Sequence, residues 1–354
     1  MSLLGAISWS IFITTEEVTG WFTTGDVRLG EAVAFWVDEP GVGALRRQPI
    51  ADPNDGEVLV RTRFTGISRG TEASVFRGRV PASERERMRA PFQEGDFPGP
   101  VKYGYLNVGV VEHGPESLRG ETVFTLFPHQ SAFVVPVGAV VAVPRDVPAR
   151  RAVLAGAVET AVNVLWDAAP LIGDRVTVVG AGMIGCCVAR LLRGIPGIEV
   201  LLVDVDASRR TVADRLDVGF AEPGDAPGGR DLVINTSGSE TGLQLALESV
   251  VDDGEVIEAS WYGDRPVTLA LGADFHSRRL TIRSSQVGAV SRRRRGTRTT
   301  RDRLTLALEL LHDQAFDALL TGDSPWKDLP AVMAGLAAGP STELCHTIDW
   351  TDAP

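Results

Sequence analysis

A glycine-rich turn is the segment whose residue types and spacing indicate chemistry most directly. It reads Gly180-Ala181-Gly182-Met183-Ile184-Gly185, follows a valine-rich run at residues 175–179 and leads into an apolar helical pattern. In such a turn the first glycine permits a tight bend, the second lets the backbone approach a pyrophosphate, and the third lets the helix pack against the strand. The free N–H groups at the helix start would bind the phosphates. We therefore predict a dinucleotide site containing Gly180, Gly182, Met183, Ile184 and Gly185.

An acidic residue, Asp204, ends the next strand-like segment after this turn. A carboxylate at this point accepts hydrogen bonds from ribose hydroxyls and repels the 2′-phosphate of NADP, so we predict NAD as the cofactor. Arg209 and Arg210 follow closely and leave NADP as an alternative, although arginines there usually lie on the exposed face of the next helix. A second alternative is a Rossmann-like domain that uses the glycines only for packing.

The elements that must position this turn alternate between strand and helix from about residue 152 onward. We expect strands at residues 175–179, 199–204, 231–235, 255–259 and 281–285, and helices at residues 154–169, 180–193, 208–216 and 242–250. Strands that alternate with helices form a parallel sheet with helical crossovers. The sequence therefore predicts an α/β fold with a Rossmann doubly wound parallel sheet over residues 152–291.

The first part of the chain has a different pattern. Short β-branched runs separated by Gly and Pro predict a mostly antiparallel β domain, with strands at residues 32–37, 57–64, 108–112, 122–126, 132–135 and 140–143. The charged stretch within residues 83–99 predicts a short surface helix followed by a loop. Near the end we expect helices at residues 302–313 and 329–338 and a strand at residues 345–350. This tail is too short for its own core, so we assign residues 31–151 and 292–354 to the β domain and residues 1–30 to an N-terminal extension.

Composition and charge exclude several classes of function. The chain has 354 residues and a net charge of −11, which argues against a general nucleic-acid binder because such proteins carry a basic face. The three cysteines, Cys186, Cys187 and Cys345, exclude a disulfide framework and a cysteine-rich structural zinc site, and they favour a cytoplasmic setting. The apolar run at residues 3–13 is too short to span a membrane and lacks the basic start of a signal peptide.

The order of a β domain, a Rossmann domain and a return to the β domain resembles the medium-chain dehydrogenase/reductase superfamily, the alcohol dehydrogenase and quinone oxidoreductase group, over about residues 31–350. In that superfamily a Cys in a Gly-Ile-Cys motif, a His in a Gly-His-Glu motif and a third residue bind catalytic zinc. Here the corresponding positions hold Ser68, Tyr105 and Gly156. A hydroxyl, a phenol and a hydrogen atom are not zinc ligands, so the chain resembles a zinc-independent branch.

The resemblance implies further features of the site and the assembly. The β domain would be GroES-like, and a homodimer would form through the edge strand at residues 281–285. Thr160 would lie beside the nicotinamide, Arg69 would bind the pyrophosphate, and Gln286 would present its backbone to the carboxamide. The residues at the ends of two Rossmann strands would contact the ribose and the nicotinamide, namely Thr236, Ser237, Gly238 and Ser260.

Hydride transfer to a carbonyl places negative charge on its oxygen, and without a metal a hydrogen-bond donor or general acid must stabilise that charge. We expect a cleft lined by Ser68, Thr71, Glu72, Lys102, Tyr103, Tyr105 and His129. Tyr105 is the first candidate donor. Lys102 would lower the pKa of the phenol or bind an acidic substrate, and Ser68 and Thr71 would relay a proton. Each of these residues has an alternative role. Tyr105 would be a core aromatic and Lys102 a surface charge. His129 would be a structural histidine, and Glu72 would anchor Arg69.

Together these features predict a zinc-independent, NAD(P)-dependent oxidoreductase. It would transfer hydride between nicotinamide and a small alcohol, carbonyl or activated alkene, with no nucleic-acid or membrane partner. The alternative is a non-catalytic dinucleotide-binding or sensor protein on the same fold, which the missing zinc ligands would also fit. The four arginines at residues 292–295 predict a solvated loop, with binding of an acidic or phosphorylated substrate as the alternative.

Overall fold

The computed structural model describes residues 28–339 and 341–354, and the chain divides into two compact units. The first unit comprises the chain up to Val153 together with Gly322–Ser341 and His346–Pro354. The second comprises Leu154–Thr321 and Thr342–Cys345. Residues 1–27 of the predicted extension lie outside the described residues, while residues 28–30 begin the first strand.

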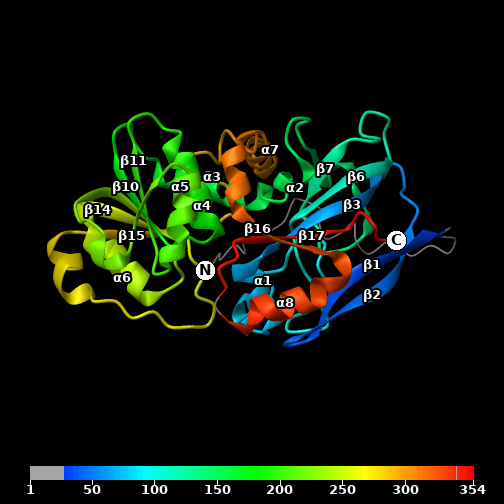
Figure 1. Cartoon of the computed structure of the whole chain (residues 1–354), viewed down its shortest axis with the longest axis horizontal. Coiled ribbons are helices and arrows are strands. Elements are labelled where there is room, and N and C mark those ends of the chain that lie inside the picture. The colour runs from blue at the N-terminus through cyan, green and yellow to red at the C-terminus, as the bar shows by residue number, and fades with distance from the viewer. Residues whose placement is uncertain (1–27, 340) are drawn as a thin grey trace, which may run out of the picture. The chain divides into compact units, whose positions relative to one another are not determined.

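The second unit is built on a six-stranded sheet in which neighbouring strands are parallel (Figure 1). In the order β12-β11-β10-β13-β14-β15, the strands are Gly219–Ala221, Glu199–Val203, Arg175–Val179, Arg230–Asn235, Val250–Glu258 and Thr281–Ser284. The chain runs outward from β10 to β12 and then returns to the other side of β10. Ligands of open α/β sheets bind beyond the carboxyl ends of the strands at such a reversal of strand order. The predicted parallel sheet is therefore confirmed, and its site is expected beyond β10 and β13.

Three helices connect strands of this sheet, as parallel pairing requires, namely α4 (Met183–Arg193), α5 (Arg210–Arg215) and α6 (Glu240–Ser249). Helix α3 (Ala155–Ala168) precedes β10, and α7 (Thr300–Leu310) follows β15. Val179 and Val233 pack with Leu243 and Leu247 of α6 in one buried cluster, which is why the valine-rich runs form strands covered by helices.

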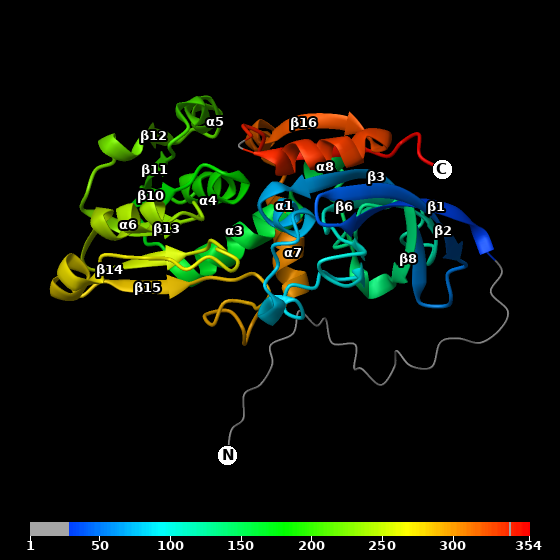
Figure 2. The ribbon, with the colours of Figure 1, turned by 90° about the horizontal axis from the view of Figure 1, so that it is seen from below.

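The first unit contains two mainly antiparallel sheets, as the sequence predicts. In the order β2-β1-β5-β4, the strands of the smaller sheet are Val42–Ala51, Arg28–Glu39, Val101–Lys102 and Glu94–Gly95, and Figure 2 shows β1 and β2 side by side. The larger sheet has the order β16-β17-β3-β6-β7-β9, with β8 also paired to β3. These strands are Leu320–Pro325, Cys345–Asp349, Glu57–Ser68, Asn107–His113, Thr122–Thr125 and Val140–Ala142, and β8 is Ala132–Pro136.

The end of the chain completes the core of the first unit. Strand β17 lies next to β3, and helix α8 (Leu329–Ala338) contributes Leu329 and Met333 to a cluster that contains Phe35 and Trp350. Residues 322–341 and 346–354 belong to the first unit, to which the tail was predicted to return. Residues 292–321, which include α7, belong instead to the second unit.

A buried ion pair explains this difference. The guanidinium of Arg303 in α7 donates to Glu159 Oε1 in α3 at 2.9 and 3.0 Å and to Asn163 Oδ1 at 2.6 Å. Arg303 also donates to the carbonyl oxygen of Val287 at 2.6 Å. Because both charged side chains are buried, separating α7 from α3 would leave each charge unpaired in the interior.

Two local expectations also differ from the structure. Residues 83–99 contain the end of the 3-10 turn Ala82–Glu84, further turns and the two-residue strand β4, but no α-helix, and Pro91 and Pro98 interrupt the segment. Helix α1 (Arg69–Phe76) was not predicted, since its sequence carries few apolar residues. Helix α2 (Ala149–Ala152) is a single turn.

Among the described residues, the helices are all too short or too polar to cross a membrane.

Replacing Arg303 by Met should lower the free energy of unfolding of the second unit by about 3–5 kcal/mol, because it strands the buried Glu159 carboxylate. The pair Glu159→Leu with Arg303→Leu should recover much of that loss, since no charge remains unpaired. Urea unfolding followed by circular dichroism measures both. Arg175→Met, at the exposed pair with Asp231, is the matched control and should leave the transition midpoint unchanged. An equal effect of Arg303→Met and Arg175→Met would contradict the assignment.

Candidate dinucleotide and proton-donor site

The glycine turn lies at the reversal of strand order. Gly180 follows β10 with φ of +101°, and a Cβ there would lie 2.7 Å from Cα of Ser237, which follows β13. A Cβ at Gly185 would lie 1.9 Å from the carbonyl oxygen of Gly180. Both positions therefore require glycine, one for its backbone conformation and both for the close approach of strand and helix.

Gly182 has the opposite environment. It is the N-cap residue of α4, with φ of −75°, and a Cβ there would have no atom within 4 Å. The first turn of α4 begins with Met183 and Ile184, whose N–H groups precede the first intrahelical bond from Cys186 to Gly182 at 2.9 Å. An open backbone face at a helix N-terminus is suited to binding a pyrophosphate.

The Asp204 carboxylate is fixed beside this turn. Its Oδ2 accepts from the Ala181 N–H at 2.6 Å, and its Oδ1 accepts from the Asp206 N–H at 2.9 Å. Each oxygen retains a lone pair for a further donor. Arg209 is buried and donates to the Thr342 carbonyl at 2.6 Å, and Arg210 lies over the Phe220 ring at 4.9 Å. Both guanidinium groups are thus held by protein groups, an arrangement that suits a ribose hydroxyl better than a 2′-phosphate.

The ends of β13 and β14 are tied to the glycine turn through hydroxyl groups. Thr236 Oγ1 donates to the Gly180 carbonyl at 2.8 Å, and Ser237 Oγ donates to Asn235 Oδ1 at 2.8 Å. Ser260 Oγ accepts from the Gly238 N–H at 3.0 Å. The structure therefore brings Thr236, Ser237, Gly238 and Ser260 to the same edge of the sheet as the glycines.

Two residues at this edge escaped the sequence analysis. Asn235 Nδ2 and the Tyr262 hydroxyl both donate to Glu258 Oε2, at 2.6 and 2.9 Å. Burial and the Glu258 charge raise the pKa of Tyr262. The position of Asn235 and Glu258 as the last residues of neighbouring parallel strands was the signal that could have revealed them.

The remaining cofactor candidates of the second unit lie on α3 and on the segment after β15. Thr160 Oγ1 donates to the Gly156 carbonyl at 2.9 Å. The Gln286 carbonyl accepts from Asn163 Nδ2 at 3.2 Å, and Gln286 Oε1 accepts from the Gly288 N–H at 2.7 Å. With the bond from Arg303 to Val287, these contacts fix the backbone that follows β15.

A second cluster, in the first unit, surrounds the Tyr105 phenol. Tyr105 lies just before β6, and the N–H of Gly66, two residues before Ser68 in β3, donates to the carbonyl of Leu106 at 2.8 Å. Burial, with the nearby Glu72 charge, raises the pKa of Tyr105 to about 12, although the nearby Ser68 and Thr71 hydroxyls oppose the shift. The structure therefore brings together three of the four predicted catalytic residues. Arg69, the first residue of α1, follows Ser68 directly and is partly exposed.

Glu72 and His129 form a buried pair behind this phenol. Glu72 Oε1 accepts from the Ser68 N–H at 2.7 Å, and Glu72 Oε2 lies 2.8 Å from His129 Nε2. His129 Nδ1 lies 2.7 Å from the Thr65 hydroxyl, which accepts from the Trp350 indole N–H at 2.9 Å. The Glu72 carboxylate is thus engaged by Ser68 and His129, and its anchoring of Arg69 stays a prediction.

Lys102 does not join the Tyr105 cluster. Its side chain is fully buried, its ammonium pairs with Glu94, and it donates to Gln130 Oε1 at 2.6 Å. Desolvation lowers the pKa of Lys102, while Glu94 opposes the shift. The expectation that Lys102 lowers the pKa of Tyr105 is wrong, because the pKa of that phenol is raised and Lys102 is held by other partners. The surface-charge alternative for Lys102 is wrong as well.

The three positions that the resemblance matches to zinc ligands hold two hydroxyl groups and a glycine. Ser68 and Tyr105 belong to the first unit, and Gly156 belongs to α3 of the second. Within residues 28–339 and 341–354 there is no group of three or more His, Cys, Asp or Glu side chains that could hold a metal ion. Cys186 and Cys187 are buried in α4, and burial raises the pKa of each thiol.

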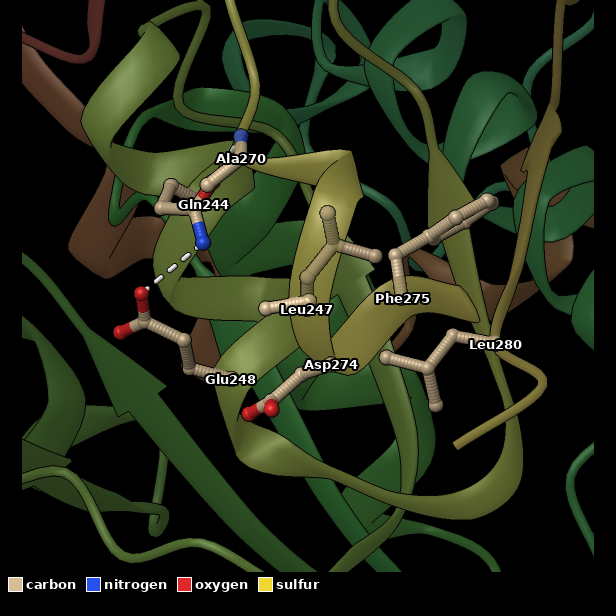
Figure 3. A pocket seen from close by; sticks show the side chains of 8 residues that line it. Gln244, Leu247, Glu248, Ala270, Asp274, Phe275 and Leu280 are labelled. Carbon is tan, nitrogen blue, oxygen red and sulfur yellow. Dashed lines mark hydrogen bonds between the residues drawn. The ribbon is translucent and has the colours of Figure 1, made fainter. Parts of the chain in front are cut away.

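A pocket of the second unit lies apart from these residues (Figure 3). It has a volume of about 210 Å³ between α6 and residues 270–280. Its polar groups bind one another, since Gln244 donates to Glu248 at 2.9 Å and accepts from the Ala270 N–H at 3.0 Å. The residues predicted for the cofactor or for catalysis do not line this pocket.

Known proteins share this architecture. No protein-family model matches the chain. The starvation-sensing protein RspB of Escherichia coli strain K12 is 24% identical over 258 residues, which cover 63% of this chain and 68% of RspB. The solved structure of RspB from E. coli CFT073, described as an alcohol dehydrogenase complexed with NADH, has a TM-score of 0.72 at 16% identity and covers 90% of this chain and 100% of that one.

Two further solved structures extend the comparison. A putative zinc-binding dehydrogenase from Sinorhizobium meliloti 1021 bound to NADP has a TM-score of 0.72 at 16% identity, covering 90% of this chain and 99% of that one. L-idonate 5-dehydrogenase from E. coli K-12 has a TM-score of 0.75 at 15% identity, covering 92% of this chain and 100% of that one. These structural neighbours are described as a short chain alcohol dehydrogenase, a putative zinc-binding dehydrogenase and L-idonate 5-dehydrogenase, and at this identity the likeness shows a shared fold. The predicted fold class is thereby confirmed.

Replacing Gly182 by Val should weaken NADH binding by about 100-fold or more, because the side chain would fill the open face at which a pyrophosphate approaches. The free energy of unfolding should change by no more than about 1 kcal/mol, the cost of losing a favourable N-cap residue. Fluorescence titration with NADH and urea unfolding measure the two quantities.

Two other glycines provide the controls for this experiment. Gly224→Val, also in open space in the second unit, should leave both quantities unchanged. Gly185→Val should impair folding, because its side chain would meet the Gly180 carbonyl. Equal NADH affinity in wild type and Gly182→Val would contradict the site.

Proposed function

We propose that this chain is an NAD-dependent oxidoreductase that transfers hydride between nicotinamide and a small carbonyl, alcohol or activated alkene. The observation that carries the proposal is the pairing of the open backbone at Gly182 with the fixed carboxylate of Asp204. The first would bind the pyrophosphate and the second the adenosine ribose. The hold of protein groups on Arg209 and Arg210 supports NAD over NADP. The dehydrogenase neighbours support the same reaction class.

Bound NADH would supply the hydride. As a carbonyl carbon accepts it, the oxygen gains negative charge, and the Tyr105 O–H would donate its proton to that oxygen. The resulting phenolate would recover a proton from solvent through the nearby Ser68 or Thr71 hydroxyl.

The raised pKa of Tyr105 favours the direction of reduction. With a pKa of about 12, the phenol stays protonated at neutral pH and is ready to donate. An alkoxide is more basic than this phenolate, so proton transfer to it is downhill. Oxidation of an alcohol would need the phenolate as base, and only about one phenol in 10⁵ would be ionised at pH 7.

We further propose that the reaction is independent of zinc. Ser68, Tyr105 and Gly156 offer no thiolate, imidazole or carboxylate, which are the ligands that zinc requires. Glu72 and His129 carry such groups, but they are bonded to each other and to Ser68 and Thr65.

The assembly and location are also proposals. Among the described residues β15 pairs only with β14, so it presents a free edge on which a second copy could extend the sheet. We propose a homodimer through this edge, and a monomeric mass in light scattering would contradict it. Three free, buried cysteines and the acidic composition support a cytoplasmic protein without nucleic-acid partners.

Tyr105→Phe should lower kcat for carbonyl reduction by about 10²–10⁴-fold, because the variant lacks the proton that neutralises the oxyanion. NADH affinity should stay unchanged. The assay follows deuterium transfer from 4-deuterated NADH to a panel of carbonyls and quinones. Tyr103→Phe is the matched control, since the Tyr103 hydroxyl faces the Met88 carbonyl at 3.4 Å. NADH binding without transfer to any member of the panel would favour the sensor alternative.

Metal analysis tests the zinc proposal separately. Purified protein should contain far less than one zinc per chain, and dialysis against a chelator should leave kcat unchanged, because the site lacks metal ligands. Inductively coupled plasma mass spectrometry measures the content. Stoichiometric zinc that is lost with activity on chelation would contradict zinc independence.

A further inference from the structure

A chain of four buried side chains runs behind Tyr105 in the first unit. Trp350, Thr65, His129 and Glu72 are each no more than 3% exposed, and their contacts measure 2.9, 2.7 and 2.8 Å in that order. The described structure gives the Thr65 hydroxyl no side-chain partner besides Trp350 and His129. The donor and the acceptor of each hydrogen bond along these four side chains can therefore be assigned.

The indole of Trp350 fixes the direction of these hydrogen bonds, because an indole N–H can only donate. Thr65 Oγ1 accepts this bond, and its own hydrogen must then be used toward His129 Nδ1, since a buried hydroxyl without an acceptor is costly. Nδ1 is thereby the unprotonated nitrogen of a neutral imidazole. Nε2 carries the hydrogen and donates it to Glu72 Oε2.

The other end of the chain reaches the proton donor. Glu72 is left as an ionised carboxylate that accepts from His129 and from the Ser68 N–H at the end of β3. Two residues before Ser68, the Gly66 N–H donates to the carbonyl of Leu106, which follows Tyr105, at 2.8 Å. Gly104, the residue before Tyr105, has φ of +129°, and a Cβ there would lie 2.8 Å from His129 Cδ2. The imidazole is thus braced directly against the backbone that carries the phenol.

This chain is unsuited to proton conduction, because it ends at an indole N–H that gives up no proton at ordinary pH. Its geometry serves orientation instead. We propose that Trp350, acting through Thr65 and His129, is a positioning residue that fixes the Glu72 carboxylate with the Ser68 backbone bound to it and, through the His129 ring against Gly104, the Tyr105 phenol. The inference rests on the proposed role of Tyr105 as proton donor. It places a determinant of that donor in the last five residues of the chain.

NMR spectroscopy measures the protonation of His129 and the environment of Tyr105 directly. The sequence has five histidines and three tyrosines, so ¹⁵N-histidine and ¹³Cζ-tyrosine spectra are simple, and His129→Gln and Tyr105→Phe assign the two signals. Wild type should show His129 protonated at Nε2 only. Trp350→Phe and Thr65→Val should both mix the two tautomers and shift the Tyr105 signal. They should also lower kcat about tenfold with NADH affinity unchanged.

Matched variants separate positioning from packing. Thr65→Ser keeps the hydroxyl and should restore the wild-type spectra. Trp326→Phe should leave them unchanged, because Trp326 stacks on Trp350 with ring centres 6.1 Å apart but has no part in the chain. His129 protonated at Nδ1 or at both nitrogens in wild type would overturn the proposal. Unchanged spectra and kcat in Trp350→Phe and Thr65→Val would also overturn it.

The two hypotheses fail in different ways. Should wild type transfer no hydride while the His129 tautomer is protonated at Nε2 and responds to Trp350→Phe, the proposed enzyme activity would fail and the orientation of Tyr105 by Trp350 would stand. Hydride transfer that depends on Tyr105 but is indifferent to Trp350 and Thr65 would leave the activity standing and refute the positioning role.

Discussion

The contact between α4 and β10 is the constraint on which the second unit depends. A carbonyl oxygen of the turn lies where any side chain at residue 185 would begin, so the helix can only start this close to the strand if that residue is glycine. This approach places the helix N-terminus at the reversal of strand order. It also places the Ala181 N–H against the Asp204 carboxylate, and the hydroxyl of Thr236 against the Gly180 carbonyl. The open backbone face at Gly182 and the fixed position of the Asp204 carboxylate are therefore products of one steric fit.

The two buried glutamates show how differently a protein can keep a carboxylate inside. Glu159 is matched by the formal charge of Arg303, and burial still raises the pKa of Glu159 because desolvation outweighs that attraction. Glu72 is held by an amide and a neutral imidazole, so its charge is not cancelled by a cation among these bonds. Burial, and after it the Glu72 charge, raises the pKa of Tyr105, whereas a bound metal would lower the pKa of an oxygen that it coordinates. The surroundings of the phenol thus favour retention of its proton, as the proposed donor role requires.

Features that depend on residues close together in the sequence could be predicted from it. The glycine spacing, the alternation of strands and helices, and Asp204 at a strand end each predict their place because the relevant contacts are close along the chain. Long-range pairing was not predictable. Arg303 meets Glu159 at a separation of 144 residues, and Trp350 meets Thr65 at a separation of 285 residues. The residues around each of these side chains do not indicate which distant residue it contacts. Lys102 was misjudged for the same reason, since its partners Glu94 and Gln130 come from other segments.

The two units are interleaved along the chain in a way that bears on synthesis. The chain leaves the second unit after Thr321, returns to it for residues 342–345, and ends in the first. Strand β17 and the indole of Trp350 emerge from the ribosome after the glycine turn and its sheet, yet they complete a sheet and a core whose other members emerged before that turn. The first unit therefore stays incomplete while the second is being made, and during that interval β3 exposes an unpaired edge. A chain whose synthesis stopped before Cys345 would have an intact glycine turn and an incomplete first unit.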